Sequence, residues 1–318
     1  MGSNYTHYKK MNQRLDTFHL RSGIEIPAIG FGPGIMGYSA KMQKSRGPMS
    51  NLLLRVYNKL YGHYRQKRDF VNAIASAFNN GFQLLDYSNA YGNQELISEA
   101  ICKSKADIND LILTSRISNH AQFQGKVRQE FFDTLSKWGV ERIDILQFHW
   151  PVTDKYVDTW KEMIRLKKEG YIRILGVANC HPHHIEELEK ATGELPEINQ
   201  VEVHPLFTQK ALIEYCKSKG IIVEAYTPVA RYDDRLVRLP LLKTLEKKYG
   251  KTFVQIILRW HIQNGVIPVV RALNPAHQKL NIDIFDFELS LDDMKLIDRL
   301  NLDSRLRYNP DNCDFTIL

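Results

Sequence analysis

Cysteine is scarce in this 318-residue sequence. The four cysteines are Cys102, Cys180, Cys216 and Cys313, and they lie far apart without any paired spacing. A disulfide framework normally needs an even set of closely patterned cysteines in an exported chain. We therefore expect reduced thiols, with a cytoplasmic location as the simplest interpretation.

Long apolar runs are also missing. No run approaches the roughly 18–20 residues that a membrane-spanning helix needs. Residues 1–14 are polar and lack the apolar centre of a secretory signal. The hydrophobic content of 43% and the charged content of 25% are ordinary for a globular protein. We expect neither a membrane span nor an export signal.

Nothing in the composition divides the chain, so we predict one domain over residues 1–318. The net charge is +7, which could attract an anionic cofactor, an acidic substrate or nucleic acid. The basic, tyrosine-containing residues 55–68 could contact RNA or lipid. A solvated helix face is the commoner explanation of such a stretch. We expect no nucleic-acid partner and no membrane partner, and the oligomeric state stays open.

Reactive side chains stand where successive apolar runs end. The run 82–85 ends at Asp86, and Tyr91 follows five residues later. The run 111–115 ends at Arg116, and the run 143–148 ends at His149. Short apolar runs bounded by polar residues indicate buried strands. A carboxylate at such a strand end is costly to bury without a partner. These four residues therefore look like one constellation.

Strands and helices alternate through most of the chain. Strand ends fall near residues 86, 115, 149, 178, 202, 227 and 270, and the first strand covers residues 28–31. Helical patterns occupy residues 95–103, 125–138, 156–168, 182–190, 209–219 and 253–263. The steps of about 25–35 residues are typical of βα units. Eight apolar strands alternating with helices favour an α/β fold, a (β/α)8 TIM barrel, over a doubly wound sheet.

Several segments lie outside this regular alternation. An N-terminal β-hairpin is predicted at residues 17–27, and a further amphipathic helix at residues 69–80. A partly helical insertion at about residues 36–67 follows strand one, where we expect it to border the substrate pocket. An extra helix covers residues 239–248, and a C-terminal extension from residue 289 contains a helix at 291–300. The glycines at 30, 32 and 34 indicate a tight turn, because no helix opens directly after them.

A barrel places its active residues at the carboxyl ends of its strands. Asp86, Arg116 and His149 satisfy this condition, and Tyr91 lies in the next loop. A cation held by a carboxylate favours a phenolate, and a histidine can orient a carbonyl oxygen. The set could protonate a carbonyl oxygen while a cofactor delivers hydride. Asp86 and Arg116 could instead form a purely structural ion pair, and His149 could be a core histidine. Their placement together on adjacent strand ends favours a catalytic role.

These motifs together resemble the aldo-keto reductase family. The resemblance rests on Gly30-Phe31-Gly32, Leu85-Asp86, Tyr91-Gly92-Asn93 and Phe148-His149-Trp150-Pro151. It continues through Gly176-Val177-Ala178-Asn179, Asn199-Gln200-Val201-Glu202, His204-Pro205, Ala225-Tyr226-Thr227-Pro228 and Phe285-Asp286-Phe287-Glu288-Leu289. Each motif is weak alone, but several in family order are specific. Only the insertion and the last residues fall outside the resemblance.

The resemblance implies NADPH-dependent reduction of an aldehyde or ketone to an alcohol, with a small carbonyl compound as substrate. By position, Tyr91 is the general acid, His149 orients the carbonyl and Asp86 holds the cation. The family has lysine where this chain has Arg116. Arginine keeps the charge, but its guanidinium is larger, planar and differently hydrated. The space beside the tyrosine must therefore differ, and reduced activity is an open alternative.

The resemblance also implies a cofactor site. Asn179 and Gln200 match residues that bind the nicotinamide amide, Tyr226 matches the residue that stacks on it, and Thr227 adjoins it. Ala178 replaces the usual serine. A second set matches the segment that grips the adenosine phosphate: Arg271, His277 and Asn281. His277 stands where many members have arginine, and histidine is a weaker partner for phosphate. NADP is the expected cofactor, with NAD as the alternative.

His181, His183 and His184 lie beside Cys180, which invites a zinc interpretation. They stand at a helix start and lack a second ligand pair, so we expect no metal. Two other functions stay open. One is a regulatory barrel that binds the cofactor with little turnover, and the other is a dehydratase or epimerase that uses the cofactor transiently. The sequence does not identify the substrate.

Overall fold

The computed structural model describes residues 5–10, 13–36 and 63–317. Its core is a closed barrel of eight parallel strands in the order β4 to β11, which confirms the predicted (β/α)8 fold. Most positions of these strands are buried on both faces, because side chains fill the barrel and helices cover its outside. The strands are β4 (Gly30–Phe31), β5 (Leu84–Asp86), β6 (Ile112–Ile117), β7 (Ile143–Phe148), β8 (Ile172–Ala178), β9 (Ile198–Glu202), β10 (Ile222–Tyr226) and β11 (Val266–Val270).

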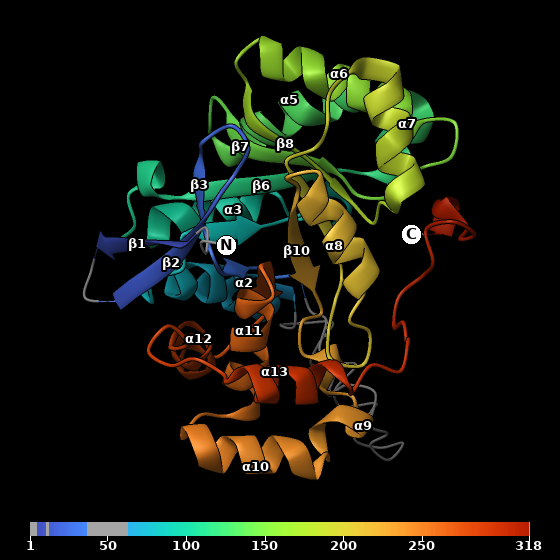
Figure 1. The fold of residues 1–318 in the computed structure, drawn as a ribbon. Helices are drawn as coiled ribbons and strands as arrows, with labels where there is room; N and C mark the ends of the chain where they lie inside the picture. The colour runs from blue at the N-terminus through green and yellow to red at the C-terminus, as the bar shows by residue number, and fades with distance from the viewer. Residues whose placement is uncertain (1–4, 11–12, 37–62, 318) are drawn as a thin grey trace, which may run out of the picture.

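Helices connect the strands on the outside of the barrel (Figure 1). The helices α3 (Glu95–Lys103), α6 (Tyr156–Lys168) and α11 (Phe253–Gln263) have the predicted boundaries. The others are α2 (His63–Asn79), α4 (Asn119–Gln124), α5 (Val127–Trp138), α7 (Pro182–Thr192), α8 (Lys210–Ser218), α9 (Asp234–Val237), α10 (Pro240–Tyr249), α12 (Pro275–Ile282) and α13 (Leu291–Asp298).

Several helix boundaries differ from the sequence prediction by one or two residues, and two differences matter for the fold. Helix α2 begins at His63 rather than at residue 69, so residues 63–67 of the expected insertion belong to this helix. Gly125 does not lie in a helix but ends α4 in a left-handed conformation with φ of 65°. Such a glycine stops a helix at little cost, and α5 then starts at Val127.

The N-terminal segment forms a three-stranded antiparallel sheet from β1 (Tyr5–Lys10), β2 (Gln13–His19) and β3 (Glu25–Pro27). The predicted hairpin corresponds to β2 and β3, whereas β1 was not anticipated. Arg21 donates to the carbonyl oxygens of Leu195 and Lys219, which precede β9 and β10. The hairpin turn therefore lies at the amino end of the barrel strands, opposite the predicted site.

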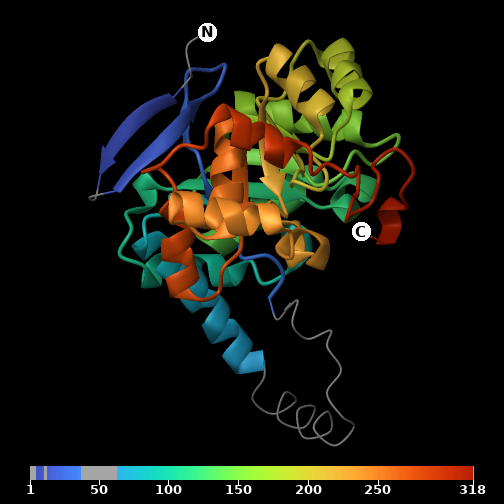
Figure 2. The same ribbon diagram turned by 60° about the horizontal axis from the view of Figure 1, so that its bottom comes forward.

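The C-terminal segment after α13, residues 301–317, is called the tail here. The amides of Leu302 and Ser304 donate to Leu206 O, and those of Leu306 and Arg307 donate to the Glu202 carboxylate. Glu202 ends β9, so the tail crosses the carboxyl ends of the strands. Figures 1 and 2 show it in red, running from α13 along one side of the molecule.

The sequence prediction for residues 36–67 lies largely outside the described residues, which resume at residue 63. Its expected position at the substrate pocket therefore stays a prediction. No helix within the described ranges is long and apolar enough to cross a membrane.

Candidate active site

The four residues predicted from the strand ends lie together at the carboxyl end of the barrel. The guanidinium of Arg116, on β6, pairs with both carboxylate oxygens of Asp86 at the end of β5, with 2.9 Å between Nη2 and Oδ2. The same Nη2 lies 3.3 Å from the Tyr91 hydroxyl. The ring of His149 stands edge-on to the Tyr91 ring, 6.0 Å between centroids. The barrel thus joins four residues that the sequence spreads from Asp86 to His149.

Local turn chemistry positions the Tyr91 phenol. Tyr91 closes a short 3-10 helix (Asn89–Tyr91) that Ser88 caps by accepting the Ala90 amide. Gly92 follows with φ of 68°, a conformation that suits glycine. The Tyr87 ring packs edge-on against Tyr91 at 5.6 Å. These contacts hold the half-buried tyrosine with its hydroxyl towards Arg116.

Arg116 is almost completely buried, with 1% of its surface exposed. Its Nη1 donates to Gln200 Oε1 at 2.7 Å and to Gln147 Oε1 at 3.4 Å. Burial disfavours the charge, but Asp86 and then Tyr91 outweigh it and raise the pKa of Arg116 on balance. A fully buried cation needs this many acceptors, because a water shell is not available.

A second buried carboxyl group, Glu224 on β10, belongs to the same network. The side-chain amides of Gln147 and Gln200 each donate to Glu224 Oε2 at 2.9 Å, and Gln200 Nε2 also lies 2.7 Å from Asp86. A Cβ atom at Gly176 would lie 2.9 Å from Gln147 Cγ, so this glycine makes room for the network. Sequence reasoning missed Glu224 and Gln147. An acid inside the apolar run 221–225 was the available signal.

Burial, followed by the nearby Asp86 charge, raises the pKa of Glu224 to about 7. The Arg116 guanidinium is therefore the counter-charge of two carboxyl groups, Asp86 and Glu224, and Glu224 is half-protonated near neutral pH. The charge of the barrel centre depends on pH in the physiological range.

We predict that Glu224 makes the folded protein less stable as the pH rises. Its pKa is raised from 4.5 to about 7 on folding, so this contribution is complete below about pH 4.5 and is lost as the pH rises through about 7. The shift corresponds to on the order of 3 kcal/mol in the free energy of unfolding. Glu224→Gln removes this titration. In urea unfolding at a series of pH values, the free energy of unfolding of the variant should therefore increase relative to that of the native chain as the pH rises. A constant difference between the two would contradict this.

His149 is held as a neutral imidazole. Burial, followed by the charges of Arg116 and Arg307, lowers the pKa of His149 to about 3. Ser88 Oγ lies 3.4 Å from its Nδ1, and the backbone oxygen of His149 accepts a hydrogen bond from Asn179. A neutral histidine can donate one hydrogen bond to an oxygen but does not bring a charge.

The residues expected at the nicotinamide gather at the ends of β8, β9 and β10. Asn179 Oδ1 accepts from the Tyr226 hydroxyl at 2.8 Å, whereas both polar atoms of Gln200 face Arg116, Asp86 and Glu224. Asn179 and Thr227 have φ of 60° and 51°. Positive φ is costly for a β-branched residue and is often found at functional sites. The buried Thr227 Oγ1 has no hydrogen-bond partner within the described part of the chain.

The residues expected at the adenosine phosphate lie after β11. Arg271 Nε donates to Pro33 O at 2.8 Å, so its side chain crosses the loop that follows β4. His277 is exposed in the first turn of α12, and Asn281 is buried one turn later. Amide groups at a helix start attract anions. The barrel brings both predicted sets to one face, in two separate groups.

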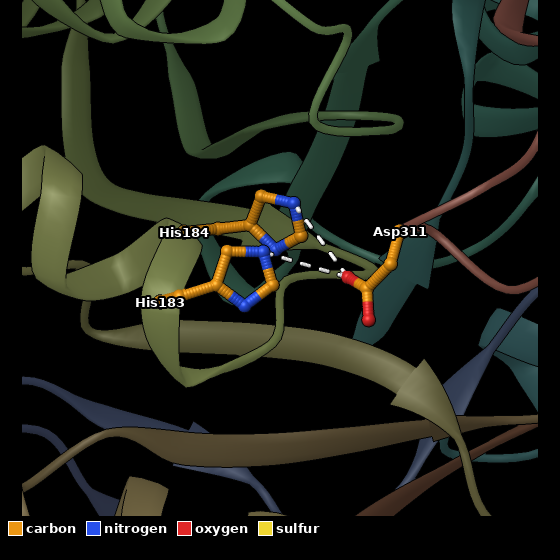
Figure 3. A group of neighbouring side chains, drawn as sticks. All are labelled: His183, His184 and Asp311. Atoms are coloured by element: carbon orange, nitrogen blue, oxygen red, sulfur yellow. Dashed lines mark ion pairs between the residues drawn. The ribbon is translucent and has the colours of Figure 1, made fainter.

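Three histidines at the start of α7 lie near one carboxylate from the tail. Figure 3 shows two of them, His183 and His184, beside Asp311. Asp311 lies 2.8 Å from His181 Nδ1, 3.5 Å from His183 Nε2 and 4.0 Å from His184 Nε2. His184 Nδ1 accepts the His181 amide, so neutral His184 carries its proton on Nε2, which faces Asp311. Coordination of a metal by that Nε2 would move the proton to Nδ1, against the amide. The geometry therefore favours a tether for the tail over a metal site.

Comparisons with known proteins identify the family of this chain. The Aldo/keto reductase family matches over residues 58–302. An uncharacterized oxidoreductase of Bacillus subtilis (strain 168), YtbE, is 39% identical over 78% of this chain and 89% of its own. Glyoxal reductase from the same organism is 34% identical over 94% of this chain and 98% of its own.

Solved structures agree as well. An aldo/keto reductase from Brucella melitensis has a TM-score of 0.77 and 31% identity, covering 90% of this chain and 99% of its own. A Bombyx mori aldo-keto reductase in complex with NADP has a TM-score of 0.78 and 26% identity, covering 93% and 95%. The family match covers the barrel strands β5 to β11, including the strand ends near Asp86, Tyr91 and His149. The chain is therefore a member of the aldo/keto reductase family.

Proposed function

We propose that this protein reduces a small aldehyde or ketone to the alcohol with NADPH. The observation that carries the proposal is the Tyr91 hydroxyl, placed 3.3 Å from the buried Arg116 guanidinium and beside a neutral His149. That arrangement suits proton donation to a carbonyl oxygen. Glyoxal reductase, a relative over nearly its whole length, makes small dicarbonyl compounds the first candidates.

Each residue has a distinct role in this proposal. Tyr91 gives its proton to the carbonyl oxygen, and the Arg116 charge stabilises the phenolate that remains. Asp86 keeps the guanidinium oriented through a bidentate pair. In this proposal the neutral His149 ring, whose Nδ1 lies 3.4 Å from the Ser88 hydroxyl, carries its proton on Nε2 and orients the carbonyl.

The nicotinamide cofactor supplies the hydride when it is bound. The site fits such a group, because Thr227 has an unpartnered buried hydroxyl and both Asn179 and Thr227 hold a strained backbone within the described residues. In our proposal Asn179, Gln200, Tyr226 and Thr227 hold the nicotinamide end. Arg271, His277 and Asn281 hold the adenosine phosphate. The side-chain amide of Gln200 already forms hydrogen bonds with Arg116 and Glu224. Gln200 can therefore bind the nicotinamide only by sharing that amide with them.

The four cysteines are unpaired, two of them buried and one exposed, as a reducing compartment allows. We therefore also propose a cytoplasmic location, which fractionation of the native cells would test.

The experiment that tests the function is fluorescence titration with NADPH and NADH, followed by cofactor oxidation with glyoxal, methylglyoxal, ketones and sugars. Tight NADPH binding with turnover is the expected result. Binding without turnover on any carbonyl would replace the enzyme with a cofactor-binding regulatory protein. Product formation without net cofactor oxidation would indicate a dehydratase or epimerase. Failure to bind either cofactor would exclude all three.

We predict that His277→Arg strengthens NADPH binding selectively. A guanidinium forms bidentate, charge-assisted hydrogen bonds with a phosphate, which the exposed His277 imidazole does not. The dissociation constant for NADPH should fall by about tenfold, while that for NADH stays unchanged, because NADH lacks the 2′-phosphate. Fluorescence titration of both cofactors measures this. A similar gain for both would mean that residue 277 does not face the 2′-phosphate.

A further inference from the structure

The tail anchors the backbone of Arg307 at the end of β9. The Arg307 amide and that of Leu306 donate to the Glu202 carboxylate at 2.9 and 2.6 Å. Further along the tail, Asp311 binds His181, and Phe315 packs 6.4 Å from the ring of Trp150, next to His149. Anchors before and after Arg307 therefore keep this stretch over the ends of β7, β8 and β9.

The two neighbouring arginines of the tail differ in how their charges are used. The Arg305 guanidinium lies 4.6 Å from the Phe207 ring, and its nitrogens approach Tyr308 O and His181 at 3.4 and 3.5 Å. The exposed Arg307 guanidinium stacks 5.4 Å from the Tyr308 ring and makes no ion pair or side-chain hydrogen bond with any described residue. Its five donors are therefore available to a ligand.

The charge of Arg307 acts on the candidate catalytic residues. After burial and Arg116, it is the next cause that lowers the pKa of His149. Burial and Glu202 raise the pKa of Tyr226, whereas Arg307 and then Arg305 work against them. The nearby acid Glu202 is fully buried and already receives His204 and two tail amides. Asp86 is likewise paired with Arg116, so neither of these two carboxylates neutralises Arg307.

We propose that Arg307 binds an anionic group on the substrate, so that the preferred substrates are small carbonyl compounds carrying a carboxylate or a phosphate. This inference rests on the proposed carbonyl reduction. A guanidinium suits either group, because its paired N–H donors match two oxygens at once. A substrate anchored at Arg307 would present its carbonyl to Tyr91 and His149 deeper in the barrel mouth.

Matched substrates test this inference. Succinic semialdehyde and butanal differ by a carboxylate in place of a methyl group, and glyceraldehyde 3-phosphate and glyceraldehyde differ by the phosphate. Arg307→Gln should lower kcat/KM for the anionic member of at least one pair by about 10- to 100-fold, mainly through KM. The neutral members should be unaffected. The pair that responds identifies carboxylate or phosphate as the anchored group.

Two further variants are controls for the effect of Arg307→Gln on the matched substrates. Arg305→Gln removes the same charge two residues away and should leave the anionic preference in place, because the Arg305 guanidinium is already occupied. Arg307→Lys should recover part of the loss, and added salt should weaken the native preference. Equal loss on charged and neutral members in Arg307→Gln, or no loss on either, would overturn the inference.

A binding measurement separates this inference from the proposed function. Calorimetric titration with succinate and with inorganic phosphate, in the presence of NADPH, reports anion binding without turnover. Weaker binding by Arg307→Gln than by the native chain supports the site even if no carbonyl is reduced. Equal binding by both proteins overturns the site even if reduction is established.

Discussion

Replacing Tyr91 by phenylalanine is expected to lower kcat by about 10²- to 10⁴-fold. The ring and its packing against Tyr87 and His149 stay, but the hydroxyl beside Arg116 is lost. A carbonyl oxygen then receives hydride-derived charge without a positioned proton donor. Steady-state NADPH oxidation measures the loss. Fluorescence titration should show cofactor binding unchanged, because Tyr91 does not belong to the proposed cofactor residues.

Tyr87→Phe is the matched control. Tyr87 is the neighbouring tyrosine, and its buried hydroxyl has no hydrogen-bond partner within the described residues. Removing that hydroxyl should leave turnover intact and cost no hydrogen bond. If Tyr91→Phe were as active as Tyr87→Phe, Tyr91 would not be the general acid, and another donor would have to supply the proton.

Arg116→Gln is expected to lower the free energy of unfolding by about 3–5 kcal/mol, because it leaves buried carboxyl groups without their cation. Asp86 and Glu224 both contact Gln200 Nε2, so their charges would repel across one amide. The loss should be largest at high pH and smaller at low pH, since protonation of a carboxyl group with a raised pKa relieves the repulsion. Urea unfolding at several pH values measures this dependence.

Two further variants serve as controls for the stability loss expected in Arg116→Gln. Arg128→Gln removes an exposed arginine that pairs with Glu162 and Glu169 on the surface, and it should change stability little. Arg116→Lys keeps the charge but offers fewer donors, so stability should fall between the native chain and Arg116→Gln. Carbonyl reduction that appears only in Arg116→Lys would mean that the arginine has silenced the site. Stability of Arg116→Gln equal to that of Arg128→Gln would contradict the charge argument.

The sequence alone was sufficient for the architecture and for much of the site. Alternating apolar strands and amphipathic helices are local patterns, so the barrel and helices such as α3, α6 and α11 could be read residue by residue. Parallel strands of a barrel end on one face. That rule predicts that Asp86, Arg116 and His149 lie together, and the observed contacts agree.

The partners of those residues depended on the tertiary structure. Gln200 stands 84 positions after Arg116, and Glu224 stands 24 positions after Gln200. Which side chains meet inside a barrel depends on strand register and on the room left by residues such as Gly176, and no local pattern encodes either. The strand β1 and the break at Gly125 were missed because their signals are weak beside their neighbours.

The tail shows most clearly how local sequence patterns and long-range packing differ in what they determine. Its sequence has no strong periodicity, so nothing local indicated that Arg307 would stay exposed beside Tyr308 while Arg305 packs on Phe207. Only the folded barrel, which brings the Glu202 carboxylate to two tail amides and His181 to Asp311, decides where these charges lie. Repeating local patterns determined the fold and its candidate catalytic residues. Long-range packing determined their charge partners and the position of Arg307, because both depend on contacts between segments far apart in the chain.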